Sequence, residues 1–276
     1  MRKYVIRPFR TVEELQECVR LQDETWGPGF TERVAPAILK VSQLLGGVAS
    51  GAYAEDGALT GFVFGMTGVR DGEVVHWSDM LAVRQEARDA GLGTRLKAYQ
   101  RERMLERGVT KMLWTFDPLQ SCNAHVNFTK LGVVVREYVR DMYGETDSPL
   151  HRGIGTDRFV ALWPLDHERV VRRLQGGERS VASAVSPDAP SALEEADRGS
   201  RLPTPAAATL GLDARWVRVS IPAEVSALMG AAMDLALAWR ATTREALTHY
   251  LDRGYEVREF LRGKRTSEYL LCAERL

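Results

Sequence analysis

The chain has 276 residues, a length that fits one large domain or two modest ones. Apolar residues make up 45% and charged residues 27%, and 37 Lys and Arg balance 37 Asp and Glu, so bulk charge does not favour a nucleic-acid partner. Cys18, Cys122 and Cys272 lie far apart, so we predict neither a disulfide framework nor a zinc pair, and we expect a cytoplasmic location. The longest apolar run, 227–239, contains Asp234 and is too short to cross a bilayer, so no membrane partner is expected.

The first 165 residues alternate between strand and helix patterns. Thr11, with Glu14 three residues later, forms a capping box that predicts the start of a helix. Asp-Gly pairs at 56–57 and 71–72 predict hairpin turns. In chain order we expect strands at 3–8, 48–54, 59–69, 73–83, 111–116, 133–139 and 158–165, and helices at 11–25, 32–45, 95–107 and 121–131.

The composition changes between Gly176 and Thr209 to Ala, Ser, Pro, Gly and charged residues, which is typical of a linker or a long surface excursion. After it we expect strands at 215–221, 255–261 and 268–272, and a helical region at 222–252 that breaks near Met233. The sequence therefore predicts three parts, which are a domain at 1–166, a helix and linker at 167–209, and a C-terminal segment at 210–276.

An internal repeat links the two halves. The segments 132–140 and 254–262 share Gly, Val, Arg, Glu and a final Arg at matching positions. Each segment follows a predicted helix and leads to a second strand. We interpret this as structural repetition, with coincidence among common helix-Gly-strand junctions as the alternative.

A phosphate-binding pattern follows the strand that ends at Val83. Residues 88–93 read Arg-Asp-Ala-Gly-Leu-Gly, and a helix begins near Thr94. Backbone N–H groups at a helix N-terminus suit a phosphate or diphosphate. Gly91 and Gly93 allow a sharp turn and a close approach of phosphate oxygens to the backbone.

Two better-known phosphate patterns do not fit this loop. A dinucleotide-binding fingerprint would need a third glycine where Leu96 stands. A P-loop would need Gly-Lys-Ser or Gly-Lys-Thr, and 93–95 reads Gly-Thr-Arg.

The pattern instead resembles motif A of the GNAT superfamily of acyl-CoA-dependent N-acyltransferases, through Arg88, Gly91 and Gly93 after an apolar strand. The next helix, the strand to Phe116, a second helix and the ending at 130–133 come in that family's order. The opening Ile-Arg-Pro at 6–8 is also similar to a GNAT first strand. The resemblance covers residues 3–165.

This resemblance implies an α/β (α+β) fold with a mixed, mostly antiparallel sheet flanked by helices, and a smaller C-terminal segment that resembles half of the same fold. It implies acetyl-CoA or another acyl-CoA as co-substrate, and no metal. The strands that end at Val83 and Phe116 would part to leave a slot for the thioester. The implied cofactor-binding residues are Leu81, Ala82 and Val83 for pantetheine, Arg88, Asp89, Ala90, Gly91, Leu92, Gly93 and Thr94 for pyrophosphate, and Asn123 and Phe128 on the second helix.

Acyl transfer to an amine needs a proton acceptor and a donor to the leaving thiolate. Phe128 falls where many relatives carry a tyrosine that protonates the thiolate, which is a departure from the family pattern. Asp79 is our first candidate base, with a hydrogen-bonded polar residue as the alternative. Asp117 is the second, and an Asp before Pro is often a turn cap. Tyr143 is the candidate replacement acid, with a packed aromatic as the alternative.

The sequence gives less information about the substrate and the residues that contact it. His76 and Arg158 are candidate substrate contacts, and Arg158 could also pair with a neighbouring carboxylate. We expect transfer of an acetyl group, or of a succinyl group held by an arginine such as Arg158, to a small amine or amino acid, with a homodimer as an option. The alternative is a non-catalytic acyl-CoA-binding or sensing protein, which the phenylalanine at position 128 favours.

Overall fold

The computed structural model describes residues 4–27, 30–144, 153–176, 185, 188–197 and 199–276, and only the backbone of Arg88, Asp89 and Ala90. The chain divides into two compact units. Unit 1 comprises residues 1–114 and 164–166, and unit 2 comprises residues 115–163 and 167–276. The predicted domain boundary at residue 166 stays a prediction.

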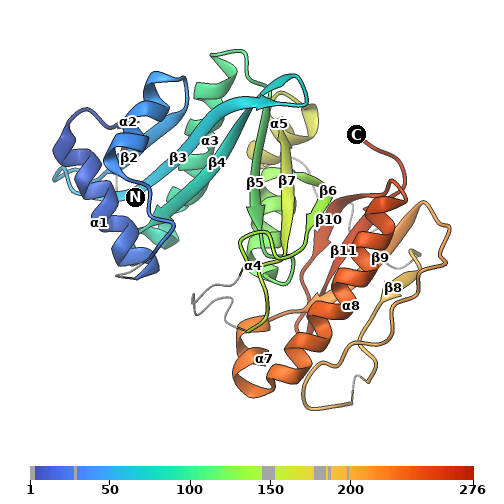
Figure 1. Cartoon of the computed structure of the whole chain (residues 1–276). Helices are drawn as coiled ribbons and strands as arrows, with labels where there is room; N and C mark the ends of the chain where they lie inside the picture. The colour runs from blue at the N-terminus through green and yellow to red at the C-terminus, as the bar shows by residue number, and fades with distance from the viewer. Residues whose placement is uncertain (1–3, 28–29, 145–152, 177–184, 186–187, 198) are drawn as a thin grey trace. The chain divides into compact units, whose positions relative to one another are not determined.

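Unit 1 contains most of the N-terminal strands and helices (Figure 1). In chain order these are β1 (Val5–Pro8), α1 (Val12–Trp26), α2 (Pro36–Leu44), β2 (Val48–Tyr53), β3 (Leu59–Arg70), β4 (Glu73–Val83), the 3-10 helix η1 (Gln85–Ala90), α3 (Leu92–Leu105) and the first four residues of β5 (Lys111–Phe116).

Local sequence signals explain where these helices begin. The Thr11 hydroxyl accepts a hydrogen bond from the Glu14 N–H at 3.3 Å, so the predicted cap of α1 is confirmed. The start predicted for α2 at residue 32 is wrong, because Pro36 occupies the first turn of that helix. Proline is pre-shaped for that position and disfavours a helical residue before it.

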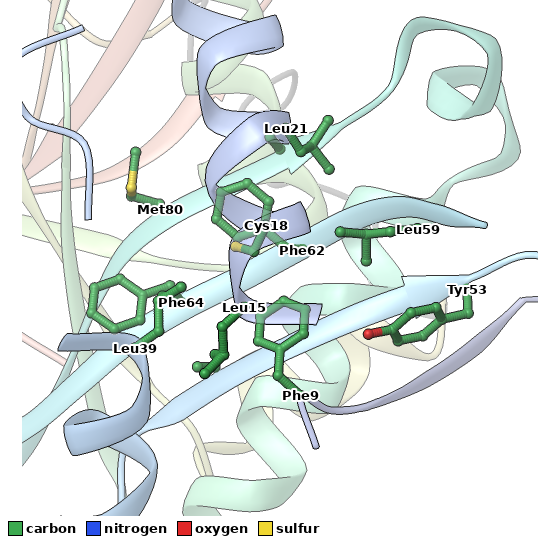
Figure 2. Close-up of a cluster of buried hydrophobic side chains, with 12 residues drawn as sticks. Phe9, Leu15, Cys18, Leu21, Leu39, Tyr53, Leu59, Phe62, Phe64 and Met80 are labelled. Carbon is green, nitrogen blue, oxygen red and sulfur yellow. The ribbon is translucent and has the colours of Figure 1, made fainter. Parts of the chain in front are cut away.

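The strands of unit 1 pair in chain order, β1-β2-β3-β4-β5. Pairing is antiparallel up to β4, and β4 with β5 is parallel. Helices α1 and α2 pack on one face through a core that Figure 2 shows, and α3 packs on the other face. This core includes Phe9, Leu15, Cys18, Leu21, Leu39, Tyr53, Leu59, Phe62, Phe64 and Met80.

Unit 2 contains the end of β5 and the remaining elements (Figure 1). These are α4 (Ser121–Ala124), the π-helix η2 (His125–Leu131), β6 (Val134–Val139), β7 (Arg158–Pro164), α5 (Glu168–Leu174), β8 (Ser191–Leu193), β9 (Trp216–Pro222), α7 (Val225–Ala231), α8 (Met233–Asp252), β10 (Glu256–Leu261) and β11 (Thr266–Cys272). The helix break predicted near Met233 is confirmed.

The strands of unit 2 follow the order β7-β6-β10-β11-β9-β8. All registered pairs among them are antiparallel except β8 with β9. Strand β8 lies within the stretch that the sequence predicts to be a linker. Ala189, Ala192 and Leu193 are buried, so part of a stretch with linker-like composition is anchored by apolar side chains.

The predicted repeat is confirmed in unit 2. Gly132 and Gly254 have positive φ angles of 74° and 90°, and each ends a helix before a strand. The β6–β7 register shifts at Arg136 and the β10–β11 register shifts at Arg258, which is the matching position of the second copy. The C-terminal segment therefore repeats the helix, glycine and bulged hairpin of the first copy.

The predicted fold class is confirmed. Both units have mixed α/β structure with mostly antiparallel pairing and helices against the strands. In the part of the chain that the structure describes, no helix is long and apolar enough to cross a membrane.

Candidate functional site

A β-bulge interrupts β4 at Asp79. Phe64 of β3 pairs with Met80, whereas Gly65 pairs with Ser78, so Asp79 has no partner on β3. A bulge adds one residue and reverses the alternation of side chains beyond it. Before the bulge, Ser78 bonds to residues of α3, and after it Met80 packs in the core beneath α1 and α2.

Strands β4 and β5 part beside this bulge. Their parallel ladder has two registered pairs, His76 with Met112 and Trp77 with Leu113. Residues 78–82 of β4 have no registered partner on β5. We call the point just beyond the last pair, between Ser78 and Trp114, the fork. The parting that the resemblance implies is thus present within unit 1.

The connection from β4 to α3 turns at Gly91. This glycine has φ 66° and ψ 18°, and it ends η1 and caps α3 at once. The predicted start of this helix near residue 94 is two residues late, because α3 begins at Leu92. The N-cap residue Gly91 has no side chain, and none of the described side chains caps α3, so among the described residues nothing competes with an anion for its first N–H groups.

Space and conformation around Gly91 suit an approaching ligand. A Cβ at Gly91 would meet no atom of the described side chains or backbone within 4 Å, and one at Gly93 would lie 3.7 Å from the Leu81 side chain. Leu92 is buried and Thr94 is exposed. The side chains of Arg88, Asp89 and Ala90 lie outside the described part of the chain. The backbone of this turn therefore carries the structural argument for phosphate binding.

Asp79 is the ionisable group at the bulge. Its side chain reaches solvent, yet the surrounding protein atoms and the negative charge of Glu32 raise the pKa of Asp79, which a Trp77 hydrogen bond partly opposes. A carboxylate with a raised pKa is a better proton acceptor near neutral pH. The geometry therefore keeps Asp79 as a candidate base.

His76 lies away from solvent in a hydrogen-bonded network. Its ring nitrogens lie 3.1 Å from Thr67 Oγ1 and 2.9 Å from Gln100 Nε2. Burial and the nearby positive charges of Lys97 and Arg107 lower the pKa of His76 to about 3. A neutral, fully buried imidazole with two partners favours a structural role over the predicted substrate contact.

Asp117 occupies a buried ion pair in unit 2. Its carboxylate accepts hydrogen bonds from both terminal nitrogens of Arg240 at 2.9 and 2.7 Å, and from the Leu119 N–H at 2.8 Å. The last contact is the turn cap that the sequence left as the alternative. With its oxygens held in this way, the geometry favours a structural role for Asp117.

Tyr143 and Arg158 lie near each other in unit 2. The Tyr143 hydroxyl is 2.9 Å from Thr115 Oγ1, and the Arg158 guanidinium carbon is 5.2 Å from the centre of the tyrosine ring. Tyr143 is exposed, whereas Arg158 is buried and donates to the Asp157 carbonyl. The exposed phenol remains a candidate acid.

Phe128 and Asn123 have different surroundings. Phe128 is fully buried, with edge contacts to the rings of Phe116 and Tyr269 at 6.1 and 5.7 Å. An aromatic core position explains why a residue without a hydroxyl is tolerated there. Asn123 is exposed on α4.

Sequence reasoning missed Lys97 of α3. Its amine lies 2.7 Å from Ser78 Oγ and 3.8 Å from the centre of the Trp114 ring. Helix spacing could have indicated this residue. A lysine three residues before Gln100 lies on nearly the same face of the helix as Gln100, which is buried. Among the described residues, no group of three or more His, Cys, Asp or Glu side chains could hold a metal ion.

No protein-family model matches the sequence, and comparison with curated proteins finds no match. Among solved structures, the chain is similar to the NatC complex bound to Gag peptide and CoA, with a TM-score of 0.47 and 13% identity over 59% of this chain and 98% of that chain. It is similar to an acetyltransferase of the GNAT family from Streptococcus pneumoniae, with a TM-score of 0.46 and 16% identity over 58% and 98%. It is also similar to Arabidopsis thaliana Naa50 in complex with a bisubstrate analogue, with a TM-score of 0.45 and 14% identity over 58% and 97%.

Proposed function

We propose that the chain is an acyl-CoA-dependent N-acyltransferase of the GNAT type, and that unit 1 binds the acyl-CoA. One observation carries the proposal. Strand β4 bulges at Asp79, parts from β5 and leads through Gly91 into the N-terminus of α3, which no described side chain caps. The open edge of β4, the gap between β4 and β5 and the proposed anion site at the N-terminus of α3 thus lie close together along the chain.

Each part of this arrangement suits one part of acyl-CoA. The pyrophosphate is an anion, and the N–H groups at 92–94 together with the positive end of the α3 dipole favour it. The pantetheine arm carries amides, which pair with the open edge of β4 as an added strand does. The thioester then reaches the gap beside Asp79.

The chemistry proposed is direct transfer from the thioester to an amine. The carboxylate of Asp79 accepts a proton from the attacking amine, and the raised pKa of Asp79 makes this transfer more favourable. From the sequence, Tyr143 is the residue suggested as donor to the leaving thiolate, since Phe128 has no hydroxyl to give. The proposed acceptor is a small amine or free amino acid, in a cytoplasmic setting.

A screen of amines with acetyl-CoA and succinyl-CoA, read by thiol release, tests this function. Release that depends on an amine supports the enzyme. The second candidate function is acyl-CoA binding without transfer, which the buried Phe128 favours. Tight binding of acyl-CoA without thiol release for any amine would select that second function.

A further inference from the structure

The amine of Lys97 occupies the fork between β4 and β5. The last registered pair joins Trp77 and Leu113, and the next residues along the two strands are Ser78 and Trp114. Lys97 touches both of them, at 2.7 Å from Ser78 Oγ and 3.8 Å from the centre of the Trp114 ring. Its side chain, anchored on α3, therefore marks the place where the strands part.

A hydrogen-bonded chain holds this amine in place. The Thr67 hydroxyl donates to a backbone carbonyl, so the His76 Nδ1–H donates to Thr67 and His76 Nε2 accepts from the Gln100 amide. The Gln100 carbonyl then accepts from the Ser78 hydroxyl at 2.8 Å. The oxygen of Ser78 is left to accept from Lys97. No member of this chain carries a negative charge.

Within the described part of the chain, Lys97 consequently has no counter-ion for the charge that it carries when protonated. Among the described residues no carboxylate forms an ion pair with it, and burial alone lowers the pKa of Lys97 to about 7. Withdrawing an ammonium group from water is unfavourable unless an anion compensates for it. A carboxylate brought to the fork by a ligand would supply that compensation.

We propose that the preferred donor is an acyl-CoA whose acyl group ends in a second carboxylate, such as a succinyl or malonyl thioester, and that Lys97 binds this carboxylate. The inference rests on the proposed function, which brings the acyl group to the fork. The sequence suggested Arg158 as the residue that holds the acyl group's carboxylate. In the present proposal, Lys97 has this role. Among the described residues, the buried Arg158 already donates to a backbone carbonyl, whereas the recorded contacts of the Lys97 amine are a hydroxyl and a ring.

Calorimetric titration of the 276-residue chain with CoA, acetyl-CoA and succinyl-CoA tests this proposal. We expect succinyl-CoA to bind about tenfold more tightly than acetyl-CoA, which corresponds to one charge-assisted hydrogen bond. The ratio should fall to about one in Lys97→Gln and be partly kept in Lys97→Arg, by the same reasoning. Lys40→Gln is the matched control, because Lys40 is an exposed lysine of the same unit.

The outcomes separate the two proposals. If the wild-type protein binds acetyl-CoA and succinyl-CoA equally, the assignment of Lys97 is wrong and the acyltransferase proposal stands. A preference for succinyl-CoA that survives in a folded Lys97→Gln protein also overturns it, as does an acetyl adduct on Lys97 after incubation with acetyl-CoA. If the wild-type protein binds none of the three ligands, the proposed function fails as well.

Discussion

Val135 and Val257 face each other in the antiparallel pair of β6 and β10, and they occupy the same position in the two copies of the repeat. Antiparallel pairing of equivalent residues creates a local two-fold axis, as at an isologous interface between two subunits. The second copy thereby pairs with the edge of β6, which would otherwise present unpaired backbone groups. Within unit 2, one chain thus supplies both halves of a symmetric pairing.

Among the described residues, the second copy has no counterpart of the glycine turn that joins β4 to α3, so we predict one acyl-CoA per chain. In the second copy β9 leads into the seven-residue helix α7 through Ala223 and Glu224, without a glycine at the connection. Calorimetric titration with CoA should fit one site per chain. A stoichiometry of two would show that unit 2 binds CoA independently.

Gly91→Glu should abolish the rise in melting temperature that CoA causes. A side chain and a negative charge would then stand where we place the pyrophosphate, while the open space around Gly91 leaves the fold intact apart from strain of about 1 kcal/mol from the positive φ. Gly108→Glu is the matched control, because Gly108 has φ 73°, is equally uncrowded and follows the other end of α3. A normal CoA response in folded Gly91→Glu would remove this turn from the site.

Asp79→Asn should lower kcat by about 100-fold, a typical general-base contribution, with little change in CoA affinity. Because the pKa of Asp79 is raised, activity should increase with pH above the usual range of an aspartate, and the variant should lose this rise. Steady-state rates across pH measure both effects. Asp71→Asn, at the exposed turn before β4, should behave as the wild type. An unchanged pH profile in Asp79→Asn would assign the proton to another acceptor.

Asp117→Asn should destabilise the protein by about 3–5 kcal/mol, because it leaves the buried Arg240 without its carboxylate. Denaturant unfolding of Asp117→Asn, Arg240→Met and the double variant measures this, and the double variant should lose less than the sum of the two. Asp213→Asn is the control, since Asp213 is exposed and 3.7 Å from Arg253. A fully stable but inactive Asp117→Asn would instead support the catalytic role that the sequence suggested.

Stability should fall as pH decreases from about 6.5 toward 3, in part through His76. The folded state lowers the pKa of His76, so the unfolded state binds the proton more readily, at a cost of up to about 1.4 kcal/mol for each pH unit. Unfolding free energies at several pH values should fall less steeply for His76→Gln than for the wild type. Parallel pH curves for the two proteins would show that His76 is not buried as described.

Strand boundaries were largely predictable because they depend on local signals. The Asp-Gly turn at 71–72 and the apolar run after it correctly place β4 at 73–83, and Gly254 correctly separates α8 from β10. The predicted helix boundaries were less accurate where a proline or a glycine overrode the hydrophobic periodicity. Pro36 shortened α2, and Gly91 served as both the end of η1 and the cap of α3.

The backbone conformation of the candidate site could be predicted from the sequence, but the contacts of its side chains could not. The glycine-containing turn follows from sequence spacing alone. The ion pair between Asp117 and Arg240 joins residues 123 positions apart, and no local pattern links them. For Lys97, helix spacing could place it on the same face as Gln100, but its contact with Trp114 of a neighbouring strand could not be predicted locally.

The bulge at Asp79 determines which changes in length the unit can tolerate. Two residues added at the 71–72 turn would lengthen β3 and β4 equally and leave the paired residues beyond it in register. Deletion of Asp79 alone would keep Ser78 opposite Gly65 and Met80 opposite Phe64, so the core under α1 and α2 would survive and only the bulge and its carboxylate would be lost. Deletion of Met80 would instead bring the Asp79 carboxylate opposite Phe64, on the core side of the sheet. Insertions and deletions in natural or laboratory variants should therefore collect at the turn and avoid the segment from Asp79 to Gly91.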